Sequence, residues 1–228
     1  MSWLRYKGVT HYPVLHREVS QLVAEYLELV EDSKPQVQMF DGTFGGGGHS
    51  AKLLEQHPNL KILGTDLDYS LLEQCRHEYA HFIKKRRLAL EHTNFVNIPA
   101  IDLKTAFNRK ITVKDKFDIG LLDLGFSNFQ VTDSERGFSY LPENDDSVLD
   151  MWFDSSPDSQ LVTASDILNG SSQLELTQIF KKFADERFAP VLAGKIIESR
   201  EGNILSTTGD FKEAIGRAFP RSSLAERN

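Results

Sequence analysis

The sequence has 228 residues, of which 40% are hydrophobic and 26% are charged, values that fit one globular domain or one domain with a large insertion. The net charge of −7 argues against a protein that coats nucleic acid through its overall field, and a solvated helix end is the simpler interpretation of the basic run 84–87. A single cysteine excludes an internal disulfide and a cysteine-based metal site, and no apolar stretch is long enough to cross a membrane.

Hydrophobic residues recur at helical and strand spacing in alternation through the first half of the chain. The spacing predicts helices over about 16–31, 51–56, 71–83 and 98–107, and strands over 37–40, 59–65, 88–90 and 117–122. This alternation with short connections is typical of an α/β fold with a parallel, doubly wound sheet and helices on both faces. Right-handed crossovers then place every strand's carboxyl end on one rim, where open α/β sheets bind ligands.

The character of the sequence changes after Tyr140. Residues 141–157 are acidic and contain prolines and serines, so we expect a loop. From Thr163 to Phe219 helical spacing dominates, with an interruption at 202–209. The sequence therefore predicts two domains, an α/β ligand-binding domain over residues 1–140 and a helical subdomain over residues 141–228.

A glycine-rich loop follows the first predicted strand, in the run DGTFGGGGH at 41–49. Consecutive glycines tolerate positive φ and let the backbone approach a ligand closely. The helix that begins near Gly48 and His49 offers backbone N–H groups to a carboxylate or a phosphate. Structural turns also use glycine, but four glycines between a strand and a helix favour a ligand site.

Acidic and aromatic residues follow the other predicted strands. Asp66, at the end of the second strand, can accept hydrogen bonds from both ribose hydroxyls of a nucleoside, and this position suits NAD as well as S-adenosylmethionine. Asp68 is instead suited to cap the next helix. Asp123, at the end of the fourth strand, can face a sulfonium group or a substrate amine. Phe95 can lie against an adenine ring or belong to the core.

Several runs in a fixed order carry a resemblance to a known family. They are HYPVL at 11–15, DGTFGGGGH at 41–49, LDLG at 122–125, ERGFS at 135–139, LDM at 149–151 and DERFA at 185–189. Together they resemble the MraW-type cytosine-N4 methyltransferases of small-subunit ribosomal RNA, over nearly the whole chain. The resemblance implies a Rossmann-like class I methyltransferase sheet with an inserted helical subdomain that helps to form the RNA-facing cleft.

The same resemblance implies methyl transfer from S-adenosylmethionine to the exocyclic amine of a cytidine in small-subunit ribosomal RNA. It implies a cytoplasmic location in a bacterium and a mitochondrial one in a eukaryote. We expect no metal site. The residues that would contact the cofactor are Gly47, Gly48, His49, Asp66, Phe95, Asp123 and Gln130. Asp123 is also our hypothesis for the group that accepts a hydrogen bond from the amine. Phe126 and Phe129 are candidates either for stacking on the target base or for the core.

The sequence departs from the family around the expected substrate cleft. Asn128 and Phe129 stand where the family usually has a serine and a small residue, and Trp152 stands where it has an arginine. Loss of an arginine weakens phosphate contact, so the departures bear more on substrate binding than on cofactor binding. The family also finishes its sheet with strands that follow the helical insertion, and we expect an incomplete sheet with an open edge here.

Three interpretations of this open edge remain. The chain can be a fragment of a longer enzyme, a shortened relative whose edge is covered by a protein or ribosomal partner, or a chain that receives strands from another chain. The alternative to an enzyme is accordingly a catalytically inactive methyltransferase-like component of a ribosome or another complex. An NAD-dependent oxidoreductase is a third candidate, but it accounts only for the glycine loop and Asp66.

Overall fold

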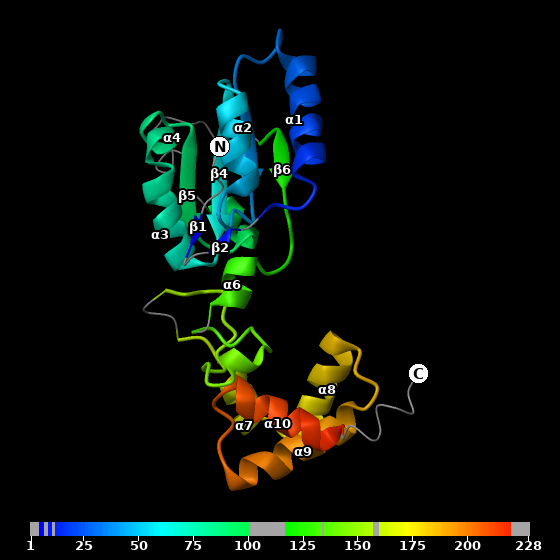
Figure 1. The fold of residues 1–228 in the computed structure, drawn as a ribbon. Helices are drawn as coiled ribbons and strands as arrows, with labels where there is room; N and C mark the ends of the chain where they lie inside the picture. The colour runs from blue at the N-terminus through cyan, green and yellow to red at the C-terminus, as the bar shows by residue number, and fades with distance from the viewer. Residues whose placement is uncertain are drawn as a thin grey trace. The chain divides into compact units, whose positions relative to one another are not determined.

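A computed structural model describes residues 5–6, 9–10, 12–100, 117–133, 135–156 and 160–219. The chain forms two compact units (Figure 1). The first comprises Met1–Phe129 and Phe153–Ser159, and the second comprises Gln130–Trp152 and Gln160–Asn228.

The predicted division between residues 140 and 141 differs from this observed division. The last residue before the boundary, Phe129, is buried in the core of the first unit, whereas Leu149 is buried in the core of the second. The second unit therefore starts at Gln130, and the chain returns to the first unit at Phe153. The composition of the sequence indicates the acidic loop. The burial of single side chains decides whether a segment belongs to the core of the first or of the second unit.

The first unit is built on a parallel sheet, as predicted. Its strands are β3 (Val37–Asp41), β4 (Leu60–Asp66), β5 (Leu88–His92) and β6 (Ile119–Leu121), in the spatial order β5-β4-β3-β6. The chain runs outward from β3 through β4 to β5 and then returns to the other side of β3. The order therefore reverses between β3 and β6, which is where open α/β sheets form ligand crevices.

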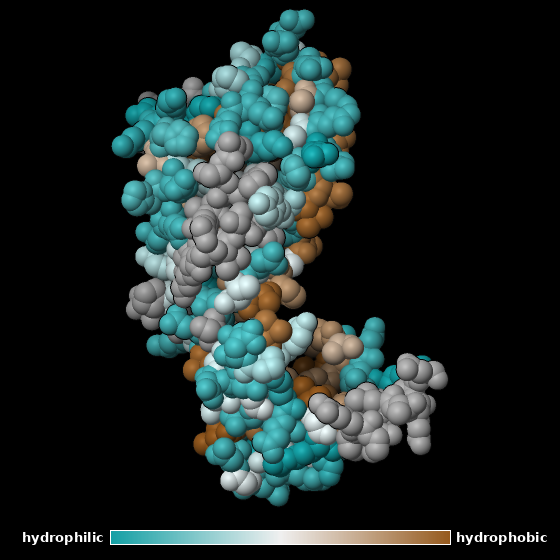
Figure 2. Space-filling model, in the orientation of Figure 1, coloured by the Kyte–Doolittle hydropathy of each residue, from teal (hydrophilic) through white to brown (hydrophobic). Residues whose placement is uncertain are grey.

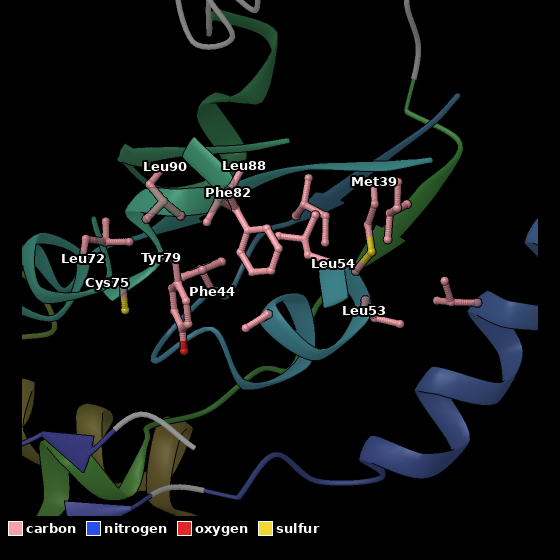
Figure 3. Close-up of a cluster of buried hydrophobic side chains, with 14 of the residues drawn as sticks. Met39, Phe44, Leu53, Leu54, Leu72, Cys75, Tyr79, Phe82, Leu88 and Leu90 are labelled. Carbon is pink, nitrogen blue, oxygen red and sulfur yellow. The ribbon is translucent and has the colours of Figure 1, made fainter. Parts of the chain in front are cut away.

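Four helices cover one face of this sheet. They are α1 (His16–Val30), α2 (Gly48–Gln56), α3 (Tyr69–Glu78) and α4 (Ala80–Lys84). Their apolar residues share one core with alternate residues of the strands, among them Met39, Leu53, Leu54, Leu72, Phe82, Leu88 and Leu90 (Figure 3).

The helix predicted over 71–83 is instead two helices. Tyr79 leaves the helical region, with φ −97° and ψ 21°, and forms the end of α3 and the start of α4. Apolar spacing continues across the break, so periodicity alone could not reveal it. The two-residue strands β1 (Arg5–Tyr6) and β2 (Val9–Thr10), an antiparallel pair, were also too short for a periodic signal.

The opposite face of the sheet carries a smaller apolar cluster. Phe40, Leu63 and Ala89 are buried there, and Phe95 and Ile98 of the 3₁₀ helix η1 (Phe95–Ala100) pack against them. The predicted helix over 98–107 lies mostly outside the described residues.

The second unit is helical, as its apolar spacing predicted. It contains α7 (Ala164–Gly170), α8 (Gln173–Ala184), α9 (Ala189–Gly202) and α10 (Thr208–Ala218), with the single turn η2 (Pro142–Asn144) before them. The helix α6 (Asn128–Thr132) carries the chain from one unit to the next. The buried core residues of the second unit are Leu149, Leu168, Leu176, Leu192, Ala193, Ile196, Leu205 and Ala214.

Capping boxes define where three of these helices begin. Thr163, Ser172 and Thr207 each accept from the backbone N–H three residues later, and the acidic residue there accepts from the cap's own N–H.

Hydrophilic side chains cover much of the surface seen in Figure 2. Within the described ranges, no helix is long and apolar enough to span a membrane.

Candidate cofactor site

The candidate site lies where the sheet order reverses, at the carboxyl ends of β3 and β6. The backbone N–H of Gly42 donates to the carbonyl of Leu121 at 3.0 Å. The N–H of Asp123 donates to the hydroxyl of Thr43 at 2.7 Å. The structure therefore ties the glycine loop and the loop that carries Asp123 directly to each other.

One side of the glycine loop is packed against the core. Gly47 has φ +72°, and a Cβ atom there would lie 2.7 Å from both the Phe44 and the Tyr79 rings. The hydroxyl of Tyr79 donates to the carbonyl of Gly46 at 2.8 Å. Glycine is thus required here by both backbone conformation and space, and the loop is held in one shape before any ligand binds.

The neighbouring glycine differs from Gly47 in its surroundings. Gly45 also has a positive φ, of +52°, but the nearest atom to a Cβ built there is the carbonyl oxygen of Thr43 at 4.0 Å. Helix α2 begins directly after the loop, and its first internal bond runs from the N–H of Ala51 to the carbonyl of Gly47 at 2.7 Å. The loop therefore combines an open side at Gly45 with the start of a helix, an arrangement suited to a ligand carboxylate.

Asp66 closes the loop from the neighbouring strand. One carboxylate oxygen accepts from the N–H of Gly45 at 2.6 Å and the other accepts from the N–H of Asp68 at 2.9 Å. Burial raises the pKa of Asp66, while these hydrogen bonds act in the opposite direction. The carboxylate is thereby held in a fixed orientation beside the loop. The prediction that Asp68 caps the next helix is confirmed, since it accepts from the N–H of Leu71 at 3.2 Å.

A second carboxylate, Asp41, lies beneath the loop. Only 2% of Asp41 is exposed, and it accepts from the hydroxyl of Ser50 at 2.6 Å and the N–H of Thr43 at 3.3 Å. Burial raises the pKa of Asp41 to about 6, with smaller contributions in the same direction from the charges of Asp66 and Asp123. Sequence reasoning included Asp41 only as the start of the loop, because the pattern of residues carries no signal for burial of a carboxylate.

The raised pKa of Asp41 predicts a pH-dependent cost of folding. The native state holds the proton more tightly than the unfolded chain, so stability falls as pH rises from about 4 to about 6. An Asp41→Asn variant lacks this ionisation, and its stability relative to wild type should rise by about 3 kcal/mol across that range. Urea unfolding at pH 4.0, 5.0, 6.0 and 7.0 measures the difference. The exposed Asp146→Asn variant should show no such trend, and an equal trend in both variants would contradict the assignment.

Asp123 lies beside His49, at the start of helix α2. Its carboxylate is 3.9 Å from Nε2 of His49, whose side chain is 9% exposed, whereas that of Asp123 is 45% exposed. The carboxylate of Asp123 is therefore accessible, whereas the imidazole of His49 is enclosed. The exposure of the Asp123 carboxylate is compatible with either a cofactor-binding or a substrate-binding role.

The aromatic candidates separate into different environments. Phe95 is partly buried against the second apolar cluster, as a core residue would be. Phe129 is 3% exposed and belongs to the main core, so only Phe126, at 63% exposed, remains a candidate for stacking on a base. Gln130 is buried within the second unit, and its cofactor contact stays a prediction.

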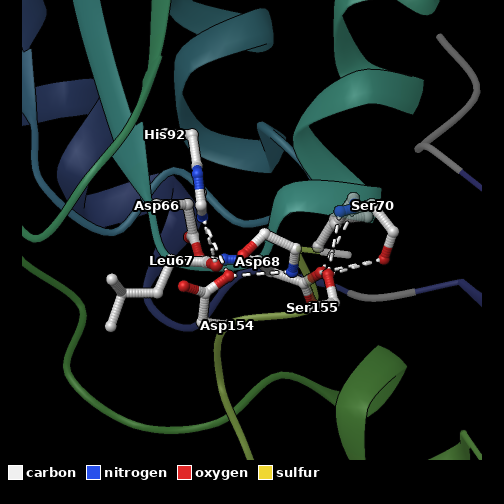
Figure 4. Close-up of polar contacts among 9 residues, drawn as sticks. Asp66, Leu67, Asp68, Ser70, His92, Asp154 and Ser155 are labelled. Carbon is white, nitrogen blue, oxygen red and sulfur yellow. Dashed lines mark hydrogen bonds and ion pairs between the residues drawn. The ribbon is translucent and has the colours of Figure 1, made fainter. Parts of the chain in front are cut away.

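Sequence reasoning missed a polar network beside Asp66. His92, Asp154 and Ser155 surround the turn that follows β4 (Figure 4). Asp154 and Ser155 belong to the acidic loop that composition indicated only as irregular structure. Among the described residues, no group of three or more His, Cys, Asp or Glu side chains is placed to hold a metal ion.

One protein family and several known proteins are similar to this chain. The sequence profile of the MraW methylase family matches residues 8–228. The chain is 34% identical over 213 residues to ribosomal RNA small subunit methyltransferase H of Thermobifida fusca, covering 93% of this chain and 58% of that protein. Proteins of the same name from Corynebacterium kroppenstedtii and Sulfurihydrogenibium azorense are 35% and 34% identical over 93% of the chain, which covers 53% and 64% of their lengths. The chain thus spans less than two thirds of the length of these relatives.

Proposed function

Since this chain belongs to the MraW methylase family, we propose that it binds S-adenosylmethionine and transfers its methyl group to the N4 amine of a cytidine in small-subunit ribosomal RNA. The similar proteins from three bacteria are named as methyltransferases of small-subunit ribosomal RNA. The observation that carries the proposal is the arrangement of Asp66, whose two oxygens are held by the N–H groups of Gly45 and Asp68 beside the open side of the glycine loop.

The residues present fit this cofactor. When bound, S-adenosylmethionine supplies an electrophilic methyl group on a positively charged sulfur. The charges of Asp66 and Asp123 lie close enough to Asp41 to contribute to its raised pKa, and a site with three carboxylates favours a cation. Asp66 would accept from the ribose hydroxyls, since a carboxylate at the end of the second strand binds ribose in related folds.

The remaining cofactor contacts in the proposal come from the loop and from neighbouring elements. Gly47, Gly48 and His49, at the start of α2, would bind the carboxylate end of the cofactor through backbone N–H groups. Phe95 would border the adenine with the part of its ring that remains exposed. Gln130 completes the set that the family resemblance implies.

The proposed chemistry requires positioning rather than strong base catalysis. The lone pair of an aromatic amine is delocalised into the ring, so the amine has to be held in line with the bond that breaks. Asp123, which is accessible at the start of α2, would accept a hydrogen bond from the amine N–H and increase its electron density. The target base has to leave its stack to reach the site, and the exposed ring of Phe126 offers a stacking surface.

The partner and location of the protein follow from the substrate in this proposal. Small-subunit ribosomal RNA is the RNA partner, in the cytoplasm of a bacterium or in the mitochondrion of a eukaryote. Among the described residues, β6 pairs only with β3, and a strand from a protein partner could pair with its other edge. The named relatives are methyltransferases, so they give no support to the alternative of an inactive structural component.

Two measurements test the proposal together. Calorimetric titration with S-adenosylmethionine should give micromolar binding, and transfer of a labelled methyl group to small ribosomal subunits should yield N4-methylcytidine. Asp123→Asn should reduce the transfer rate at saturating cofactor by about 100-fold, while the exposed Asp146→Asn should change neither binding nor transfer. Binding of reduced nicotinamide without binding of S-adenosylmethionine would refute the proposal in favour of an oxidoreductase.

A further inference from the structure

One short segment of the acidic loop belongs to a different unit from the chain on either side of it. Residues 153–156 lie in the first unit, although Trp152 and Gln160 both belong to the second. The segment contacts the turn 66–70 that joins β4 to α3 (Figure 4). Asp66 lies at the start of this turn, so these contacts bear on the cofactor site.

The first contact passes through His92 at the end of β5. Its Nε2 atom lies 3.0 Å from the carbonyl oxygen of Leu67 and 3.1 Å from a carboxylate oxygen of Asp154. A carbonyl oxygen only accepts hydrogen bonds, so Nε2 carries the proton and donates to both oxygens. Asp154 also accepts from the N–H of Ser156 at 2.9 Å, which fixes its side chain. The imidazole is thereby held over the residue that directly follows Asp66.

The second contact joins Ser155 to the start of α3. Its hydroxyl donates to the carboxylate of Asp68 at 2.9 Å and accepts from the N–H of Ser70 at 2.9 Å. Asp68 is only 1% exposed, and its own N–H donates to Asp66. Ser155 thus satisfies one backbone N–H of the first turn of the helix and orients the residue whose N–H holds Asp66.

We propose that Asp154 and Ser155 are positioning residues for the cofactor site. They hold the turn after β4 so that Asp66 keeps both of its hydrogen bonds, one from Gly45 in the glycine loop and one from Asp68 in the turn, and in this way they set the affinity for the cofactor. The inference rests on the proposed function, because it assumes that Asp66 binds S-adenosylmethionine.

The test compares cofactor binding by matched variants. Asp154→Ala and Ser155→Ala should each raise the Kd for S-adenosylmethionine by about tenfold, as the loss of one partly buried hydrogen-bonded group does. Asp154→Asn and Ser155→Thr retain the acceptor and the hydroxyl, so both should bind within about twofold of wild type. Ser172→Ala, which removes a hydroxyl of similar capping function in the second unit, is the control and should leave the Kd unchanged.

Steady-state kinetics distinguish positioning from general damage. The KM for S-adenosylmethionine should rise in the two alanine variants while kcat at saturating cofactor stays unchanged. A fall in kcat without a change in KM would overturn the inference, as would alanine variants that bind the cofactor like wild type.

A readout without cofactor keeps the inference separate from the proposed function. In Ser155→Ala, the amide of Ser70 loses its acceptor and should exchange faster with solvent deuterium whatever the role of Ser155. Positioning predicts in addition that the amides of Gly45 and Asp68, which bond to Asp66, exchange at least tenfold faster. If only the amide of Ser70 exchanges faster, the inference fails. If wild type binds no cofactor but all three amides respond, the proposed function fails while the positioning of Asp66 stands.

Discussion

Replacement of Asp66 by alanine is expected to weaken S-adenosylmethionine binding about 100-fold, which corresponds to about 2.7 kcal/mol. The change removes the carboxylate that would accept from the ribose hydroxyls, and hydrogen bonds to a charged group contribute about 1.5–3 kcal/mol each. It also leaves the N–H groups of Gly45 and Asp68 without their acceptor, so the loop loses its fixed shape. Calorimetric titration of wild type and variant measures the difference.

The ionisation of Asp66 adds a second expectation. Because burial raises its pKa, protons compete with the cofactor, and affinity should fall as pH falls through that raised value. In Asp66→Asn this part of the pH dependence should disappear. Asp146→Ala, on the exposed surface of the other unit, is the control and should bind normally. Equal affinity of Asp66→Ala and wild type, with the fold verified by circular dichroism, would show that the cofactor does not depend on this carboxylate.

Replacement of Gly47 by alanine should cost about 3 kcal/mol of folding free energy. Its φ of +72° disfavours any residue with a Cβ atom by about 1 kcal/mol. The added methyl group would also lie 2.7 Å from Phe44 and Tyr79, and overpacking of a filled core costs about 1–3 kcal/mol. Urea unfolding should show a lower midpoint with an unchanged m-value.

Gly45 offers a matched comparison within the same loop. Its φ is also positive, but a Cβ atom there meets nothing nearer than 4.0 Å. Gly45→Ala should therefore cost only about 1 kcal/mol, the conformational part of the effect. If the two alanine variants were equally stable, packing against Phe44 and Tyr79 would not be the reason for glycine at position 47.

Much of the first unit could be predicted from local pattern. The strands of the sheet are short apolar runs, and alternate residues of β3 and β4 face two cores before these strands end at Asp41 and Asp66. Such signals depend on neighbouring residues only, and for that reason the parallel order and the rim with Asp66 and Asp123 could be anticipated. The helices α8, α9 and α10 were predictable for the same reason, since apolar residues recur at helical spacing.

The features that escaped prediction depend on residues far apart in the chain. Tyr79 ends α3 where its hydroxyl reaches Gly46, 33 residues away. Asp41 acquires its raised pKa from burial that no neighbouring residue reveals.

The sequence by itself determined the alternating α/β pattern, the glycine loop and the acidic residues that end the strands, because these are properties of short segments. Only the tertiary structure decided that Phe129 belongs to the core, that Asp66 is held through both oxygens, and that Asp154 and Ser155 border its turn. Ser155 and Asp68 are 87 residues apart, and no local periodicity can encode a contact over that separation.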